Sequence, residues 1–259
     1  LLESKHEVKA IVSNPAKPMG RKRVLKHTDV GSYSLQNNIE LIELDSFNND
    51  TIYKKLLSLN VDIFVVVAFR ILPEKYISIP KFGSINLHAS LLPSYRGAAP
   101  IQWALMNGDK TTGVSVFQIE KKVDTGKIIT QAKIDIDKND NYEILSNKLS
   151  KVGAGALVEA LNNLEEGEVD YNKQDKSLVT KAPKISKEML RIQWDWPAAK
   201  INNWVRGLSP KPCMMAIFQN KRTKILKTLV LDDKVKSAPG KIKAAANSSL
   251  EIYTGRGLI

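Results

Sequence analysis

Three polar residues stand at the ends of stretches that have strand character. Asn86 and His88 lie in the apolar stretch 83–89, and Asp124 follows the strand-like stretch 112–119. Because side chains alternate along a strand, Asn86 and His88 point to the same face. An amide beside an imidazole can stabilise a developing oxyanion and transfer a proton. The three residues therefore suggest acid–base chemistry at a strand end.

The role of Asp124 has two interpretations. If the strand before it neighbours the strand that carries His88, its carboxylate lies beside the imidazole, orients the ring and favours the protonated form. An aspartate before Thr-Gly also commonly bonds its own backbone in a turn. An Asn-x-His pair alone is equally typical of two satisfied polar groups at a strand end. The residues by themselves leave both interpretations open.

The loop 90–100, "SLLPSYRGAAP", also has two interpretations. Its prolines and glycine can shape a turn into the next helix. Alternatively, its backbone together with Leu91 and Leu92 forms a wall for an aromatic ligand, with Arg96 near an anion.

Strands and helices alternate around these residues. This alternation predicts an α/β fold with a mostly parallel sheet, in which ligands bind beyond the carboxyl ends of the strands. The continuous apolar stretch 61–69 predicts a strand covered on both faces. Residues 1–5 are expected to be the end of a helix. The other expected strands are 8–12, 83–89, 112–119 and 127–136, and the expected helices are 51–59, 99–108 and 141–167.

The pattern changes after Gly167. Residues 168–186 are polar and without periodicity, and we interpret them as a linker. A helix over 197–208, closed by Gly207, is followed by short strand-like stretches with polar breaks, which is typical of a small oligonucleotide-binding (OB-like) barrel. The expected domains are therefore 1–167 and 187–259, joined by the linker.

Positive charge is concentrated in the last third of the chain. The net charge is +12; residues 1–180 carry 23 Lys and Arg against 22 Asp and Glu, and residues 181–259 carry 16 against 5. This asymmetry indicates a module that faces a polyanion such as nucleic acid. The stretch 14–27 adds five basic residues, no acidic one, and two prolines and a glycine that disfavour a helix. Such a mobile basic loop can grip phosphates, or simply be a solvated surface.

Several classes of protein are disfavoured. The single cysteine, Cys213, excludes an internal disulfide and a cysteine-cluster metal site, and three histidines argue against a histidine-rich one. No apolar run approaches the ~18 residues that a membrane span needs, and no secretory signal is visible. A cytoplasmic enzyme or binding protein is therefore expected.

Residues 85–129 closely resemble the signature of the methionyl-tRNA formyltransferases. They are similar more broadly to the formyltransferases that use 10-formyltetrahydrofolate. The resemblance extends to "NPAKPMGRKR" (14–23), "FVVVAFRILP" (64–73) and the stretch 182–212. It therefore covers essentially the whole chain.

The resemblance implies a doubly wound formyltransferase domain followed by an OB-like, tRNA-binding barrel. The family's first strand and its Gly-Thr-Pro turn would precede Leu1, and we expect the natural protein to be longer at both ends. No metal is implied. The implied catalytic residues are Asn86, His88 and Asp124. The implied folate contacts are Ser90, Leu91, Leu92 and Pro93, with the pterin against Phe69, Arg70, Ile71 and Leu72. The implied tRNA contacts are Arg21, Lys22 and Arg23.

The implied reaction moves a formyl group from 10-formyltetrahydrofolate to the α-amine of methionyl initiator tRNA, in support of translation initiation. The expected protein is a monomer of the bacterial cytosol, or of an organelle of bacterial origin. The alternatives are formylation of a small amine, such as an amino-sugar nucleotide or glycinamide ribonucleotide, hydrolysis of 10-formyltetrahydrofolate, and a non-catalytic RNA-binding protein.

Overall fold

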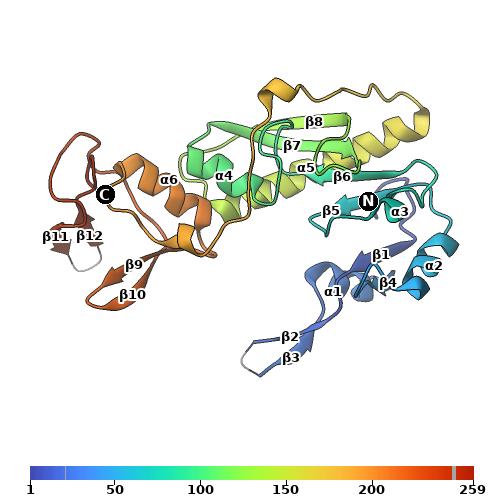
Figure 1. Cartoon of the computed structure of the whole chain (residues 1–259), viewed down its shortest axis with the longest axis horizontal. Helices are drawn as coiled ribbons and strands as arrows, with labels where there is room; N and C mark the ends of the chain where they lie inside the picture. The colour runs from blue at the N-terminus through green and yellow to red at the C-terminus, as the bar shows by residue number, and fades with distance from the viewer. Residues whose placement is uncertain (21, 247–248) are drawn as a thin grey trace.

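A mixed four-stranded sheet forms the centre of the fold. The computed structural model describes residues 1–20, 22–246 and 249–259. The sheet has the order β5-β6-β7-β8; β5 and β6 run parallel, and the other two pairs are antiparallel. Figure 1 shows the long helix α5 running along this sheet, where it contacts β7 and β8. The strands and the helix are β5 (Phe64–Val67), β6 (Ser84–His88), β7 (Thr111–Gln118), β8 (Ile128–Asp135) and α5 (Tyr142–Glu166).

The N-terminal part forms a second, two-stranded sheet. β1 pairs in parallel with β4, and α1 connects the two strands and packs against both. The predicted α/β class is confirmed. The four-stranded sheet is mixed, because residues 119–127 return the chain from β7 to the antiparallel β8 without a helix, and β6 and β7 are antiparallel although a helix over 100–107 lies between them. The elements of this part are β1 (Ala10–Ser13), α1 (Asp29–Gln36), β4 (Glu40–Glu43), α2 (Asp50–Ser58) and α3 (Glu74–Ile77).

The predicted limits of two helices are confirmed by their capping residues. α4 (Pro100–Asn107) has its proline in the first turn, and Gly108 ends it in the left-handed region at φ 77°. α5 begins at Asn141, whose side chain accepts from the backbone N–H of Ile144, and ends at Gly167 at φ 73°. These two helices flank the strands that carry the site.

Three predictions about the N-terminal part are wrong. Residues 1–5 form turns and not the end of a helix. β5 is only partly buried, and its Val67 is 53% exposed, because no described strand pairs with its second edge. The stretch 14–27 is not an irregular loop but a hairpin that projects from the rest of the chain (Figure 1). Its strands are β2 (Lys17–Met19) and β3 (Val24–Lys26).

The C-terminal part begins with α6 (Ala198–Leu208) and continues as two hairpins. Among the described residues β9 pairs only with β10, and β11 only with β12, without a closed barrel. Gly207 lies inside α6 and does not end it; a Cβ there would stand 2.8 Å from Cγ of Met106, so glycine lets α6 approach α4. The strands are β9 (Met214–Phe218), β10 (Lys221–Ile225), β11 (Ile242–Ala246) and β12 (Ser249–Ile252).

Helices α4 and α6 join the two parts of the molecule. Met106 of α4 shares one buried cluster with Ile201 and Val205 of α6, and the Trp103 and Trp204 rings meet edge to face at 6.2 Å. Nη1 of Arg206 donates 3.1 Å hydrogen bonds to the carbonyl oxygens that precede α5, those of Asp137, Lys138 and Asp140. The C-terminal part is therefore held against the first by both apolar packing and a half-buried cation.

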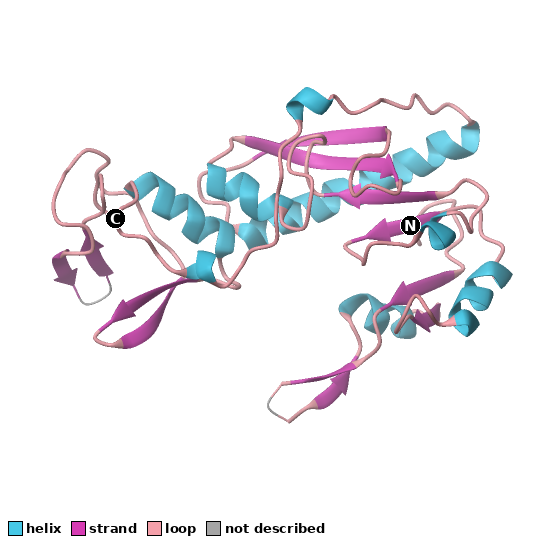
Figure 2. Cartoon of the chain, in the orientation of Figure 1, coloured by secondary structure: helices cyan, strands magenta, loops and turns pink. Residues whose placement is uncertain are grey.

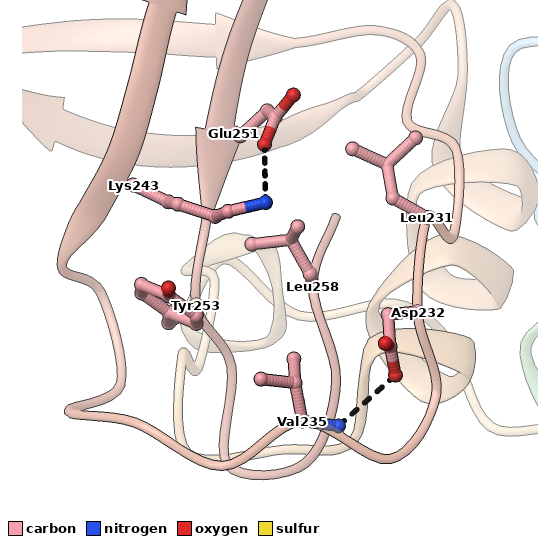
Figure 3. Close-up of a pocket in the computed structure, with 7 residues that line it drawn as sticks. All are labelled: Leu231, Asp232, Val235, Lys243, Glu251, Tyr253 and Leu258. Carbon is pink, nitrogen blue, oxygen red and sulfur yellow. Dashed lines mark hydrogen bonds and ion pairs between the residues drawn. The ribbon is translucent and has the colours of Figure 1, made fainter.

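A pocket of about 320 Å³ lies in the C-terminal part (Figure 3). Leu231, Val235 and Leu258 line it beside Lys243 and Glu251, which pair with each other at 3.1 Å.

No helix in the described part of the chain is long and apolar enough to cross a bilayer.

We expect Arg206→Met to destabilise the protein by about 2 kcal/mol, because hydrogen bonds to a charged donor contribute ~1.5–3 kcal/mol and the methionine keeps only the apolar stem. The measurement is the urea midpoint at constant m value. Arg191→Met, which removes the same charge from an exposed position, is the matched control. Equal midpoints for both variants would contradict this account of the interface.

Candidate functional site

Strand β6 presents Asn86 and His88 on the face of the sheet opposite α5. Leu87 points toward the helix, because its Cδ2 lies 2.9 Å from where a Cβ on Gly153 of α5 would stand. β7 pairs with β6, with Ser115 opposite His88. The expected neighbouring of these strands is confirmed. Because they run antiparallel, β7 ends beside the start of β6, with Gln118 opposite Ile85, and the segment after it must fold back to reach His88.

His88 and Asp124 meet at this end of the sheet. Nδ1 of His88 lies 4.0 Å from Oδ2 of Asp124, and both side chains are almost buried, with 8% and 11% exposed. Nε2 of His88 lies 2.9 Å from the carbonyl oxygen of Tyr95. A carbonyl only accepts, so Nε2 carries a hydrogen and Nδ1 is the nitrogen that faces the carboxylate.

The carboxylate of Asp124 is held by a backbone donor from a different loop. Its Oδ2 accepts a 2.8 Å hydrogen bond from the N–H of Gly97, while its own backbone is in the left-handed region at φ 54°. The carboxylate therefore joins loop 90–100 to the turn after β7 and does not bond the backbone of its own turn. The carboxylate thus lies beside the imidazole, which is the placement that the first interpretation of this residue expected.

Asn86 is the third side chain of the group. It is half-buried, and within the described part of the chain no hydrogen bond engages its amide. Its donors and its acceptor are thus available to a bound molecule on the face that it shares with His88.

Loop 90–93 is held from below by two polar side chains. Oγ of Ser115 accepts from the N–H of Leu92 at 2.9 Å and donates to the carbonyl of Ser90 at 2.6 Å. Nε2 of Gln131 donates to that Oγ at 2.7 Å and to the carbonyl of Leu92 at 3.0 Å. Ser90 is fully buried and Leu92 is 3% exposed, packed against Phe117. A ligand at this loop would therefore meet Leu91, Pro93 and backbone.

Sequence reasoning missed Ser115 and Gln131. The only signal for Ser115 was a polar residue between two valines, Val114 and Val116, of a strand-like stretch. A buried hydroxyl must be hydrogen-bonded, and that requirement could have singled it out.

Residues 69–72 follow β5, whose Val66 pairs with Asn86, so they lie at the same end of the sheet as the site. The guanidinium of Arg70 donates to the carbonyls of Leu44 and Asp45, the latter at 3.1 Å. Ile71 is 71% exposed. The charge of Arg70 is thus used within the protein, and the apolar side chain and the backbone are what this segment offers to a ligand.

Tyr95 fixes the carbonyl that receives His88. Its hydroxyl donates to Oδ2 of Asp109 at 2.6 Å and accepts from the amide of Asn107 at 3.0 Å. Burial first, and then the hydrogen bond to Asp109, raise the pKa of Tyr95 to about 12. The phenol stays protonated, so Tyr95 serves as an anchor and not as a base.

The stretch 168–186, expected to be a plain linker, packs against the site. Figure 2 shows it as a long loop with one short helical turn, Lys176–Leu178. Nε and Nη2 of Arg96 both donate to Oε1 of Gln174, at 3.0 and 2.5 Å. Arg96 therefore secures the loop. The second interpretation of loop 90–100 expected this guanidinium to lie near an anion, but its Nε and Nη2 are used within the protein.

The described residues include no cluster of histidine, cysteine and carboxylate side chains that could hold a metal.

Two family models match this chain. The formyl transferase model covers residues 1–161, and the model of the formyl transferase C-terminal domain covers residues 184–259. The chain belongs to the formyl transferase family. A methionyl-tRNA formyltransferase from Thermodesulfovibrio yellowstonii is 42% identical over all of this chain and 83% of its own length. One from Enterococcus faecalis is 36% identical with the same coverage.

Solved structures of formyltransferases share the fold of this family member. The sugar 3N-formyltransferase WlaRD, solved with dTDP and 5-N-formyl-THF, has a TM-score of 0.71 at 21% identity over 96% of this chain and 85% of its own. An N-formyltransferase from Helicobacter canadensis, in complex with folinic acid and dTDP-3-aminofucose, has a TM-score of 0.69 at 19% identity, over 90% and 81% of the two chains.

We expect Ser115→Ala to destabilise this formyltransferase by about 1–3 kcal/mol, because it leaves buried donors and acceptors of loop 90–93 unsatisfied. Chemical denaturation measures the change. Ser150→Ala, which removes an exposed hydroxyl bonded within α5, is the control. A loss no larger than that of the control would show that Ser115 does not hold the loop.

Proposed function

We propose that this formyltransferase transfers a formyl group from 10-formyltetrahydrofolate to the α-amine of methionyl initiator tRNA and so supports translation initiation. The observation that carries the proposal is the group formed by Asn86, His88 and Asp124 at one end of the sheet. The 35–42% identity to methionyl-tRNA formyltransferases over the whole chain supports this acceptor. The proposal treats the enzyme as a cytoplasmic monomer.

The residues at the site fit a folate co-substrate, which supplies an activated formyl group on nitrogen. The proposed contacts form two segments at the same sheet end, Ser90 to Pro93 and Phe69 to Leu72. Leu91, Pro93 and the 71% exposed Ile71 offer apolar surface for an aromatic ring, while Ser90 and Leu92 contribute through the backbone. The free amide of Asn86 lies beside them.

The three side chains divide the chemistry of formyl transfer between them. Attack of an amine on a formyl carbon builds negative charge on the formyl oxygen, and the free Asn86 amide donates to it. Because the Tyr95 carbonyl holds the Nε2–H of His88, the ring can donate to that oxygen only through Nδ1, when it is protonated. Asp124 pairs with Nδ1 of His88 and accepts the proton that the amine gives up, directly or through a water. The bond between the formyl carbon and the folate nitrogen then breaks, and the same proton passes to that departing nitrogen. Burial of the pair in a site of low dielectric strengthens this charge interaction.

The proposed tRNA contacts are on the hairpin β2–β3 and on the basic C-terminal part. Lys22 and Arg23 are exposed at the hairpin turn, and Arg21 lies outside the described residues. Oε1 of Glu43 accepts from the N–H of Ala16 and pairs with Nδ1 of His27, both at 2.9 Å, so one carboxylate anchors both stems of the hairpin to β4. We propose residues 168–186 as the linker between domains 1–167 and 187–259; most of it lies between the two family models, which end at residue 161 and begin at residue 184.

We expect His88→Ala and Asp124→Asn each to lower kcat for formylation of methionyl-tRNA by ~10²–10³-fold, because the first removes a group that faces the oxyanion and the second removes the proton acceptor. The measurement is transfer from 10-formyltetrahydrofolate to charged initiator tRNA, with small amines compared as acceptors. The controls are His6→Ala and Asp135→Asn, which lie away from the site. Near-normal turnover in both site variants would reject the assignment, and preference for a small amine would reject the acceptor.

We expect Lys22→Ala with Arg23→Ala to weaken tRNA binding and to reduce the slope of log Kd against log salt by about 1–2, because each phosphate contact releases roughly one counterion. Titrations of the tRNA at several salt concentrations give the slope. Lys133→Ala with Lys151→Ala removes the same charge from exposed positions on β8 and α5. An unchanged slope in the hairpin variant, or an equal change in the control, would place the tRNA elsewhere.

A further inference from the structure

We propose that the interdomain segment 174–182 positions the reacting groups of the site, with Gln174 acting on Asp124 and Thr180 acting on His88. This inference rests on the proposed function for its kinetic test. Neither family model includes the segment, since one ends at residue 161 and the other begins at residue 184.

Gln174 binds both loops that meet at Asp124. Its Nε2 donates to the carbonyl oxygens of Asp124 and Gly126, at 3.0 and 2.8 Å, and its Oε1 accepts the two bonds from Arg96. Arg96 directly precedes Gly97, whose N–H holds the Asp124 carboxylate. The result is a closed ring of hydrogen bonds in which one amide fixes the backbone of Asp124 and the donor to its side chain.

Thr180 holds the residue that orients His88. Its Oγ1 accepts from the N–H of Tyr95 at 2.8 Å, and its carbonyl accepts from the N–H of Arg96 at 2.9 Å. The carbonyl of Tyr95 is the acceptor for Nε2 of His88. Two hydrogen bonds, both made by the backbone of Tyr95, therefore connect Thr180 to the imidazole of His88.

The segment pairs closely with loop 95–99. Ala182 donates to the carbonyl of Arg96 at 2.7 Å and accepts from the N–H of Ala99 at 3.1 Å. Only glycine fits at position 97, because a Cβ there would stand 2.6 Å from the carbonyl oxygen of Ala182. Loop and segment thus form one unit, and the backbone N–H of Gly97 is left pointing at Asp124.

Displacement of the Asp124 carboxylate is expected to lower kcat without weakening substrate binding. Misplacing a reacting group by about 1 Å can cost ~10²-fold in rate. Among the described residues, Gln174 and Thr180 form no hydrogen bond with the proposed folate or tRNA contacts. Removing their side chains therefore acts on the geometry of Asp124 and His88 alone. This separates a positioning role from a role in binding folate or tRNA.

We expect Gln174→Leu, which keeps the bulk of the side chain and removes both sets of hydrogen bonds, to lower kcat about 10- to 100-fold while both KM values stay within about threefold. Gln193→Leu is the matched control, since that amide makes only a 3.5 Å contact with a neighbouring carbonyl. An unchanged kcat in the Gln174 variant would overturn the proposal.

A double-mutant cycle separates positioning from partial unfolding. If Gln174 acts through Asp124, Gln174→Leu has no further effect on kcat in an Asp124→Asn background. If the variant only loses folded protein, the two losses multiply, and the proposal fails. Thr180→Val supplies a second variant: it lowers kcat about tenfold, and Thr180→Ser, which keeps the acceptor, restores it.

The ring resonances of His88 give a readout that needs no acceptor. The chain has three histidines, so His88→Ala assigns the resonance by NMR. We expect Gln174→Leu and Thr180→Val to shift the His88 signal and to leave those of His6 and His27 in place. A wild-type enzyme inactive on methionyl-tRNA together with this shift would reject the proposed function and keep the inference. Unshifted His88 signals would reject the inference itself.

Discussion

One hydrogen bond, from the backbone N–H of Gly97 to the carboxylate of Asp124, joins the two loops that form the site. Without it, the turn after β7 and the loop after β6 would have no shared polar contact on the side that faces His88. The bond is charge-assisted and lies where little water reaches, which makes it stronger than a neutral bond at the surface. The positions of His88, Tyr95 and Arg96 are arranged around it.

The sequence predicted the parts of the fold that depend on local signals. Pro100 and Gly108 mark the ends of α4, and the alternation in stretch 83–89 placed Asn86 and His88 on one face. It could not predict that the faces of β5 would be only partly covered, because burial of an apolar strand depends on neighbours that its own residues do not encode. The hairpin at 14–27 was missed because a charged, exposed hairpin lacks the apolar alternation by which strands are recognised.

Within the site, the residue types could be predicted and the supports could not. Asn86, His88 and Asp124 stood out by their chemistry, whereas Gln174 and Thr180 lie in a polar stretch where nothing distinguishes them. Their proposed importance comes from contacts across 85 and 50 positions of sequence, those of Tyr95 with Thr180 and of Asp124 with Gln174. Contacts between residues so far apart in sequence are set by the tertiary fold, so no local sequence pattern predicts them.

The packing of segment 174–182 on the loop after β6 also bears on how such proteins can evolve by recombination. An exchange of C-terminal domains at Gly167, the visible end of the helical pattern, would replace the support of His88 and Asp124 together with the domain. A crossover beyond Ala182 would leave that support with its own active site. The natural unit of inheritance for this chemistry is therefore longer than the catalytic domain that its secondary structure outlines.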